Sequence, residues 1–170
     1  MTKNWSLAKR CLYRLCYDLN LKGLLLGRCQ ILDLPFRRNL TVKGDVPHQQ
    51  LLEYLCRSRL LFVPSIMDAS PRILAEALCL NVPILVHRQI LGGWKYVSKS
   101  TGVFFQSEDD ITQAAEQCLE EGFHPRRWFQ ANYGPTLSSS RLSAFLQRLD
   151  PDINSTLSLQ LAREALVPAA

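Results

Sequence analysis

Apolar residues recur along this chain in two patterns that alternate with each other. Short apolar runs such as LKGLLLG and LLFVPS are typical of strands buried on both faces of a sheet. They predict strands at residues 21–27, 40–46, 60–65, 82–87 and 101–106. Between them, apolar side chains return with the spacing of an amphipathic helix. This spacing predicts helices at residues 5–19, 47–59, 70–80, 107–122 and 138–149, and a short helix begins within 92–100.

Strands that alternate with helices predict the fold class. The pattern indicates an α/β domain with a doubly wound parallel sheet, which is Rossmann-like. Such a domain normally begins with a strand that leads into the first helix, whereas this chain begins almost inside the helix at 5–19. We therefore expect the first strand to be lacking. The domain is expected to span residues 1–149, and residues 150–170 form a weakly amphipathic tail to which the pattern assigns no role.

Polar and turn residues predict where two of the helices begin and end. Ser70 is expected to cap the helix at 70–80, with Pro71 in its first turn and Asn81 at its end. The helix at 107–122 is expected to be well capped by its acidic start and to end at Gly122.

Composition narrows the class of protein. The chain has 170 residues, of which 47% are apolar and 21% charged, and this excludes a disordered chain, a collagen-like fibre and a disulfide-stapled miniprotein. The basic residues behind the net charge of +5 are scattered and mixed with 15 acidic residues, so no nucleic-acid partner is indicated. A phosphate on a small molecule would still suit this charge. The aromatic and arginine residues of 123–133 are better explained by core packing with solvated arginines than by base stacking.

Cysteine and histidine positions predict no metal site. The six cysteines form no C-x-x-C pair, and His48, His87 and His124 are far apart. No signal peptide opens the sequence, and no apolar run approaches the length of about 18 residues that a membrane span needs. We therefore expect reduced thiols, no transmembrane segment and a cytoplasmic location. His87 and Arg88 follow a strand at its carboxyl end, where they either line a ligand cleft or have structural roles.

The stretch from residue 60 to residue 87 carries the strongest chemical signal. Asp68 lies in the loop after a strand, and the next helix begins with the backbone N–H groups and dipole that favour a phosphate. Glu76 lies among apolar residues, where ribose hydroxyls would be suitable hydrogen-bond donors to it. A purely structural interpretation stays open, in which Asp68 caps a loop and Glu76 lies on the solvated edge of the helix. Gly92-Gly93 either forms a turn that lets backbone approach a ligand or starts a helix with Trp94 in the core.

This stretch resembles the donor-binding signature of retaining, two-domain (GT-B) glycosyltransferases of family four, the glycosyl transferases group 1. The residues that match the signature as they stand are Pro64, Ser65, Pro71, Glu76, Ala77 and Pro83. Asp68 stands in place of the first glutamate of the signature, and Asn81 replaces the glycine that ends the helix. The resemblance extends over residues 40–120, and Gly92-Gly93 falls where the family has a Gly-Gly pair.

The resemblance implies a role for each matching position. Glu76 would hold the ribose of a nucleotide-sugar, and the helix start at Ser70, with the N–H groups of Arg72 and Ile73, would take its distal phosphate. Asp68 would contact the donor sugar, although its side chain is one methylene shorter than that of glutamate.

Three further segments would complete the donor site. The turn from Gly44 to Val46 would flank the base, the backbone at Gly92 and Gly93 would approach the donor, and Lys3 would help to neutralise the diphosphate. No metal and no other cofactor is implied, because Lys and Arg neutralise the diphosphate in this family.

The implied function is retaining transfer of a hexosyl group from a nucleotide-sugar to an acceptor. Members of the family also use an N-terminal domain that binds the acceptor, and this chain has no room for it. We therefore expect the acceptor to be bound by the missing N-terminal domain or by a partner chain. The alternative is a non-catalytic doubly wound binding or interaction module, a remnant or partner-dependent half of a glycosyltransferase.

Overall fold

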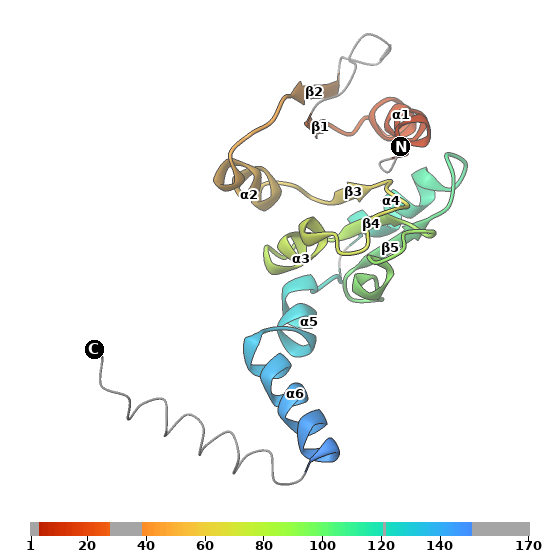
Figure 1. The fold of residues 1–170 in the computed structure, drawn as a ribbon. Coiled ribbons are helices and arrows are strands. Elements are labelled where there is room, and N and C mark those ends of the chain that lie inside the picture. The colour runs from red at the N-terminus through yellow and green to blue at the C-terminus, as the bar shows by residue number, and fades with distance from the viewer. Residues whose placement is uncertain (1–3, 28–38, 121, 151–170) are drawn as a thin grey trace. The chain divides into compact units, whose positions relative to one another are not determined.

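The fold was analysed in a computed structural model, which describes residues 4–27, 39–120 and 122–150. The chain divides into two units, Met1–Gln130 and Ala131–Ala170. The first unit contains all the strands described below (Figure 1). Every described residue of the predicted site also belongs to it.

The strands of the first unit are parallel and short, as the apolar runs predict. They are β1 (Gly23–Leu26), β2 (Leu40–Lys43), β3 (Leu61–Val63), β4 (Ile84–His87) and β5 (Gly102–Phe105). β1 pairs with β2, while β4 pairs with β3 on one side and β5 on the other. All four residues of β4 are buried, as expected for a central strand covered on both faces.

Helices cover both faces of the β3–β4–β5 sheet, and this confirms the doubly wound α/β class. The covering helices are α1 (Trp5–Tyr13), α2 (His48–Cys56), α3 (Arg72–Cys79) and α4 (Ile111–Leu119). Ile84 and Val86 of β4 pack with α2 and α3, whereas Leu85, between them, packs with α1 and α4. The alternation of side chains along β4 thus separates the two layers.

The sheet is interrupted between β1 and β3, which do not pair with each other. The first helix spans the interruption. Cys11 and Leu15 of the segment that runs from α1 into the π-helix η1 (Arg14–Asp18) pack against β4 and β5, whereas Leu12 packs against β2. Phe62 of β3 packs against both groups. Packing against one helix therefore holds the two groups of strands together.

The start of α3 differs from the prediction by one residue. Pro71, not Ser70, is the N-cap residue, because its ψ of 93° lies outside the helical range, and no side chain caps the helix. The end is as predicted. Asn81 has a φ of +63°, and the N–H groups of Asn81 and Val82 donate to the carbonyl oxygens of Leu78 and Ala77. These two bonds form a Schellman motif, so asparagine takes the position that glycine usually has.

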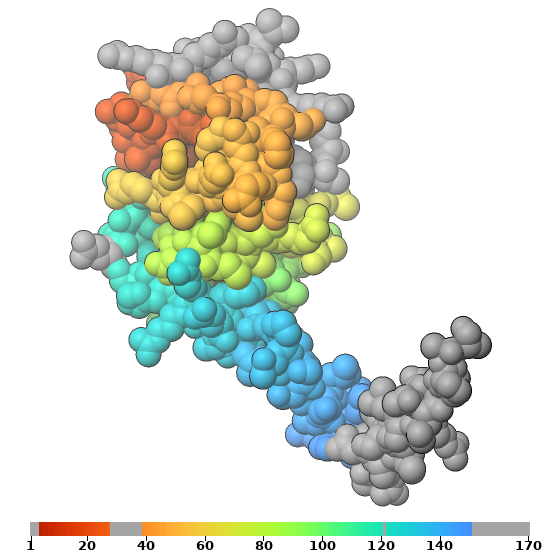
Figure 2. All heavy atoms as spheres, turned by 90° about the vertical axis from the view of Figure 1, so that its left-hand side faces the viewer, coloured from red at the N-terminus to blue at the C-terminus, as the bar shows by residue number. Residues whose placement is uncertain are grey.

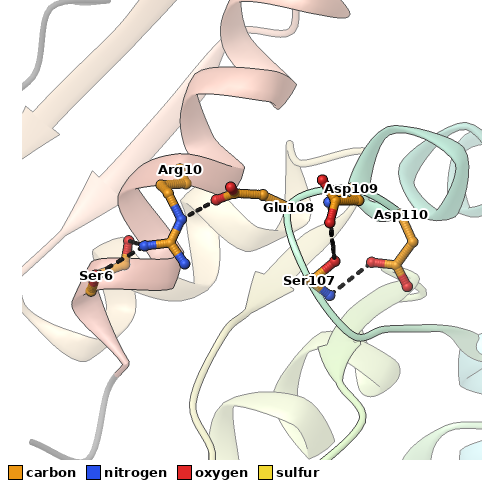
Figure 3. A network of polar contacts seen from close by, with 6 residues as sticks. All are labelled: Ser6, Arg10, Ser107, Glu108, Asp109 and Asp110. Carbon is orange, nitrogen blue, oxygen red and sulfur yellow. Dashed lines mark hydrogen bonds and ion pairs between the residues drawn. The ribbon is translucent and has the colours of Figure 1, made fainter.

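The loop before α4 explains why the predicted cap is wrong in detail. The Asp110 carboxylate accepts hydrogen bonds from the N–H groups of Gln106 and Ser107, which precede it, and makes no cap bond to its own helix. Arg10 of α1 contacts Glu108 of the same loop and Ser6 of its own helix (Figure 3). The acidic run therefore fastens the β5–α4 loop to itself and to α1. The helix ends at Leu119, before Gly122.

The pattern did not predict α5 (Pro125–Asn132), which forms within the aromatic and arginine stretch. Trp128 and Phe129 pack against the cluster around α3, so the core-packing interpretation is confirmed. Arg126 is more than a solvated cation, since its Nε donates to the carbonyl oxygen of Cys79 at 2.7 Å. The second unit contains α6 (Pro135–Leu149), close to the predicted helix. Among the described helices, none is long and apolar enough to cross a membrane.

Candidate functional site

The predicted site residues gather where the parallel strands end at their carboxyl termini. This is the edge at which ligands bind in open α/β sheets. The loop after β2 leads into α2, the loop after β3 leads into α3, and the loop after β4 contains the glycine pair. α2 and α3 lie side by side on one face of the unit, where Figure 2 shows α2 in orange next to α3 in yellow-green.

Glu76 projects from α3 toward α2, where it meets a histidine. Nε2 of His48, the first residue of α2, lies 3.0 Å from Oε1 of Glu76. The Glu76 side chain is 26% exposed, so the carboxylate is half-buried and partnered. The pattern did not indicate His48 as a site residue, but its place two residues after the turn from Gly44 to Val46 was a signal that could have found it.

The electrostatic influence of Glu76 reaches one further side chain on α3. Burial raises the pKa of the Cys79 thiol, Arg126 lowers it, and Glu76 raises it to a smaller extent. The Glu76 carboxylate therefore influences Cys79 as well as contacting His48.

Asp68 lies in a loop that is held by the backbone of the next loop. The N–H of Gly92 donates to the carbonyl oxygen of Asp68 at 3.1 Å, and the N–H of Leu91 donates to that of Ile66 at 3.0 Å. A Cβ built on Gly92 would lie 1.8 Å from the carbonyl oxygen of Ala69, a distance that no side chain tolerates. Gly92 is thus required for the two loops to approach, whether or not a ligand is present.

Gly93 and Trp94 settle part of the choice left open for the glycine pair. A Cβ on Gly93 would lie 2.8 Å from Cδ1 of Leu74 and 3.2 Å from Cγ of Pro71, so Gly93 packs against the start of α3. The 3₁₀ helix η4 (Trp94–Tyr96) begins directly after it. Trp94 is 61% exposed, so the interpretation in which Trp94 packs in the core is wrong. Met67 and Leu91, on the same pair of loops, are also exposed.

The N-terminus of α3 presents backbone donors beside this loop pair. The N–H of Leu74 is used by the carbonyl oxygen of Pro71, and no side chain caps the helix. The N–H groups of Arg72 and Ile73 have no acceptor among the described residues. Arg72 and Ser70 are exposed and Ile73 is half-buried. This arrangement suits an anionic ligand.

The segment expected to flank the base lies at the end of β2. The N–H of Gly27 donates to the carbonyl oxygens of Lys43 and Gly44, at 3.0 and 3.3 Å, and so joins the ends of β1 and β2. Gly44 is exposed and Val46 is half-buried, two residues before His48. Lys3 lies outside the described residues.

His87 and Arg88 are accounted for by structural contacts. His87 is 4% exposed, its Nε2 lies 3.1 Å from the carbonyl oxygen of Gln106, and its Nδ1 accepts from the N–H of Gln89. The guanidinium of Arg88 lies 5.5 Å from the centre of the Phe104 ring. A depression of about 740 Å³ is lined by Arg88 and by residues of β5, but none of the residues predicted for the donor site lines it. No group of His, Cys, Asp and Glu residues in the described part of the chain could hold a metal ion.

The family profile described as "Glycosyl transferases group 1" matches residues 17–134. The chain belongs to this family. Its fold is shared by two solved structures, WaaG, "a glycosyltransferase involved in lipopolysaccharide biosynthesis", and TarM. WaaG is 16% identical with a TM-score of 0.61, and the match covers 78% of this chain and 40% of WaaG. TarM is 18% identical with a TM-score of 0.67, and the match covers 88% of this chain and 33% of TarM. No curated protein matches the chain.

The match with the two solved structures covers only part of each of them. The chain spans about 40% of the length of WaaG and 33% of that of TarM, so it corresponds to a portion of each. The matched family segment contains β1 to β5 and every described residue of the predicted site. The segment that matches the family therefore contains the described part of the predicted site.

Proposed function

We propose that this domain binds the nucleotide-sugar donor of a retaining glycosyltransferase that transfers a hexosyl group. The observation that carries the proposal is Glu76, a half-buried carboxylate at the carboxyl edge of a Rossmann-like sheet, in a member of the group 1 family. Its Oε1 is held by His48, and ribose hydroxyls are suitable donors to the other oxygen. The same edge carries the backbone donors of α3 and the loop that contains Asp68.

Each part of the donor then has a place. The ribose binds at Glu76, the base lies against the turn from Gly44 to Val46, and the distal phosphate lies at the start of α3. Asp68 contacts the sugar hydroxyls from the loop that Gly92 fastens. The N–H groups of Arg72 and Ile73 and the positive end of the helix dipole stabilise the negative charge of the phosphate.

Catalysis in this proposal depends on stabilising the leaving diphosphate. As the bond to the sugar breaks, negative charge develops on the diphosphate, and fixed donors and cations already directed at it lower the barrier. Lys3 and the start of α3 supply the positive charge that stabilises the diphosphate in the proposal, and no divalent metal takes part. The sugar retains its anomeric configuration.

The acceptor is bound elsewhere in the proposal. This chain matches only a portion of WaaG and of TarM, and we infer that a second domain or a partner chain holds the acceptor. We also place the protein in the cytoplasm, since the cysteines in the described part of the chain are free.

Nucleotide binding tests the proposal directly. UDP, GDP, ADP and their common sugar conjugates are titrated into the purified chain, and backbone NMR shifts are followed. We expect saturable binding that Glu76→Ala abolishes and that Glu116→Ala, at an exposed position on α4, leaves unchanged. Absence of binding at millimolar ligand, or equal loss in both variants, overturns the donor site and favours a non-catalytic module.

A further inference from the structure

His48 is the described residue that contacts the carboxylate at the centre of the proposed donor site. It begins α2, and its Nε2 lies 3.0 Å from Oε1 of Glu76 on α3. The imidazole is 64% exposed, so its own burial does not explain the contact. Arg72 lies one helical turn before Glu76 on the same helix, yet no ion pair joins the two side chains in the described structure. His48 is therefore the basic partner of this carboxylate.

His48 lies between the segment expected to flank the base and the residue expected to hold the ribose. The turn from Gly44 to Val46, expected to flank the base, precedes His48 by only two residues. Glu76, expected to hold the ribose, touches its imidazole. A side chain on α2 thus links the segment that would contact the base to the group that would bind the sugar ring of the nucleoside.

The geometry leaves one oxygen of the carboxylate for a ligand. His48 contacts Oε1, whereas Oε2 has no hydrogen-bond partner among the described residues. A carboxylate held at one oxygen keeps its rotamer, and a fixed rotamer loses less side-chain entropy when the other oxygen accepts a hydrogen bond. Two vicinal hydroxyls would donate to a group whose direction is already set.

We propose that His48 is a positioning residue of the donor site, which holds Glu76 in the orientation that binds the hydroxyls of the donor ribose. This inference rests on the proposed function, since it assigns Glu76 to the ribose. In this proposal His48 acts through Glu76 and does not itself contact the donor sugar or the phosphates. The effect of the imidazole therefore depends on the ligand having ribose hydroxyls.

The test is a cycle in which both the protein and the ligand are changed. UDP, GDP and ADP and their 2′,3′-dideoxy counterparts, which lack both ribose hydroxyls, are titrated by calorimetry into the wild-type chain and into His48→Ala, His48→Gln and His124→Ala. Glutamine retains a side-chain N–H donor, and His124 is an exposed histidine that no site residue contacts in the described structure. Thermal unfolding of each variant shows whether the chain is still folded.

The expected result is a loss of affinity that is specific to the hydroxyl. His48→Ala weakens the ribonucleotide about three- to tenfold, the range set by one hydrogen bond. His48→Gln recovers most of the loss, His124→Ala has no effect, and the 2′,3′-dideoxy ligand binds wild type and His48→Ala equally weakly. Equal loss for both ligands, or undiminished ribonucleotide binding by His48→Ala, overturns the role of His48 alone. Failure of the wild-type chain to bind any of the nucleotides overturns the proposed function, and the inference with it.

Discussion

Gly92 and Ala69 approach each other so closely that a Cβ on Gly92 would lie 1.8 Å from the carbonyl oxygen of Ala69. The two residues belong to the loops that follow β4 and β3, and the N–H of Gly92 donates to the carbonyl oxygen of the adjacent Asp68. The position of Asp68 therefore depends on a residue that lacks a side chain in the neighbouring loop.

Gly92→Ala is expected to destabilise the chain and displace the Asp68 loop. The added methyl group clashes with backbone, which cannot rotate away, so the free energy of unfolding should fall by about 1–3 kcal/mol. Urea unfolding measures it. Gly44→Ala is the matched control, because nothing lies within 4 Å of a Cβ at Gly44. A Gly92→Ala chain as stable as wild type would show that the two loops separate without loss.

Asp68→Ala is expected to weaken sugar conjugates more than the free nucleoside diphosphate. In the proposed donor complex Asp68 contacts only the sugar, so its loss removes about one charge-assisted hydrogen bond, or about tenfold in affinity. Calorimetry with matched pairs such as UDP and a UDP-hexose separates the two effects. Asp109→Ala serves as the control, since Asp109 lies in the β5–α4 loop. Equal weakening of both ligands by Asp68→Ala would place this carboxylate near the phosphates instead.

The buried thiols are expected to make stability fall at high pH. Burial raises the pKa of Cys11 and of Cys118 to about 12, against 9.0 for a free thiol. The folded chain therefore keeps protons that the unfolded chain releases above pH 9. The stabilisation from this difference is complete below pH 9 and is lost progressively as pH rises toward 12.

Chemical unfolding at pH 8 to 11 checks this expectation. Cys118→Ala should flatten the fall in unfolding free energy, whereas Cys56→Ala should not, because Cys56 is exposed. The comparison between variants subtracts the lysines and tyrosines that titrate in the same range. An unchanged slope in Cys118→Ala would mean that this thiol ionises in the folded chain as it does in water.

Nucleotide-sugar binding is expected to be almost independent of divalent metal. The proposed site neutralises the diphosphate with helix N–H groups and basic side chains, and the described residues hold no cluster of metal-ligating groups. Binding is measured after treatment with EDTA and again with added Mn²⁺ or Mg²⁺. A strict requirement for Mn²⁺ would contradict this part of the proposal.

Much of this molecule is determined by local sequence. The apolar runs and the helical spacing place β1 to β5 and the covering helices. The fit is best for β4, whose four residues are all buried, whereas β1 and β2 are partly exposed although their apolar residues still predict strands. Asn81 predicts the end of α3, since asparagine tolerates the left-handed conformation that the Schellman motif needs. The signature around Glu76 indicates the family, and the match over residues 17–134 confirms it.

Tertiary structure decided what depends on residues distant in the sequence. His48 and Glu76 are 28 positions apart, and only the packing of α2 against α3 brings their side chains together. The interruption between β1 and β3, and the helix that joins the two groups of strands, follow from pairing partners that no local pattern specifies. Local sequence therefore predicts elements and motifs, whereas the partners of each charge and of each strand edge are fixed by the long-range packing of the whole unit.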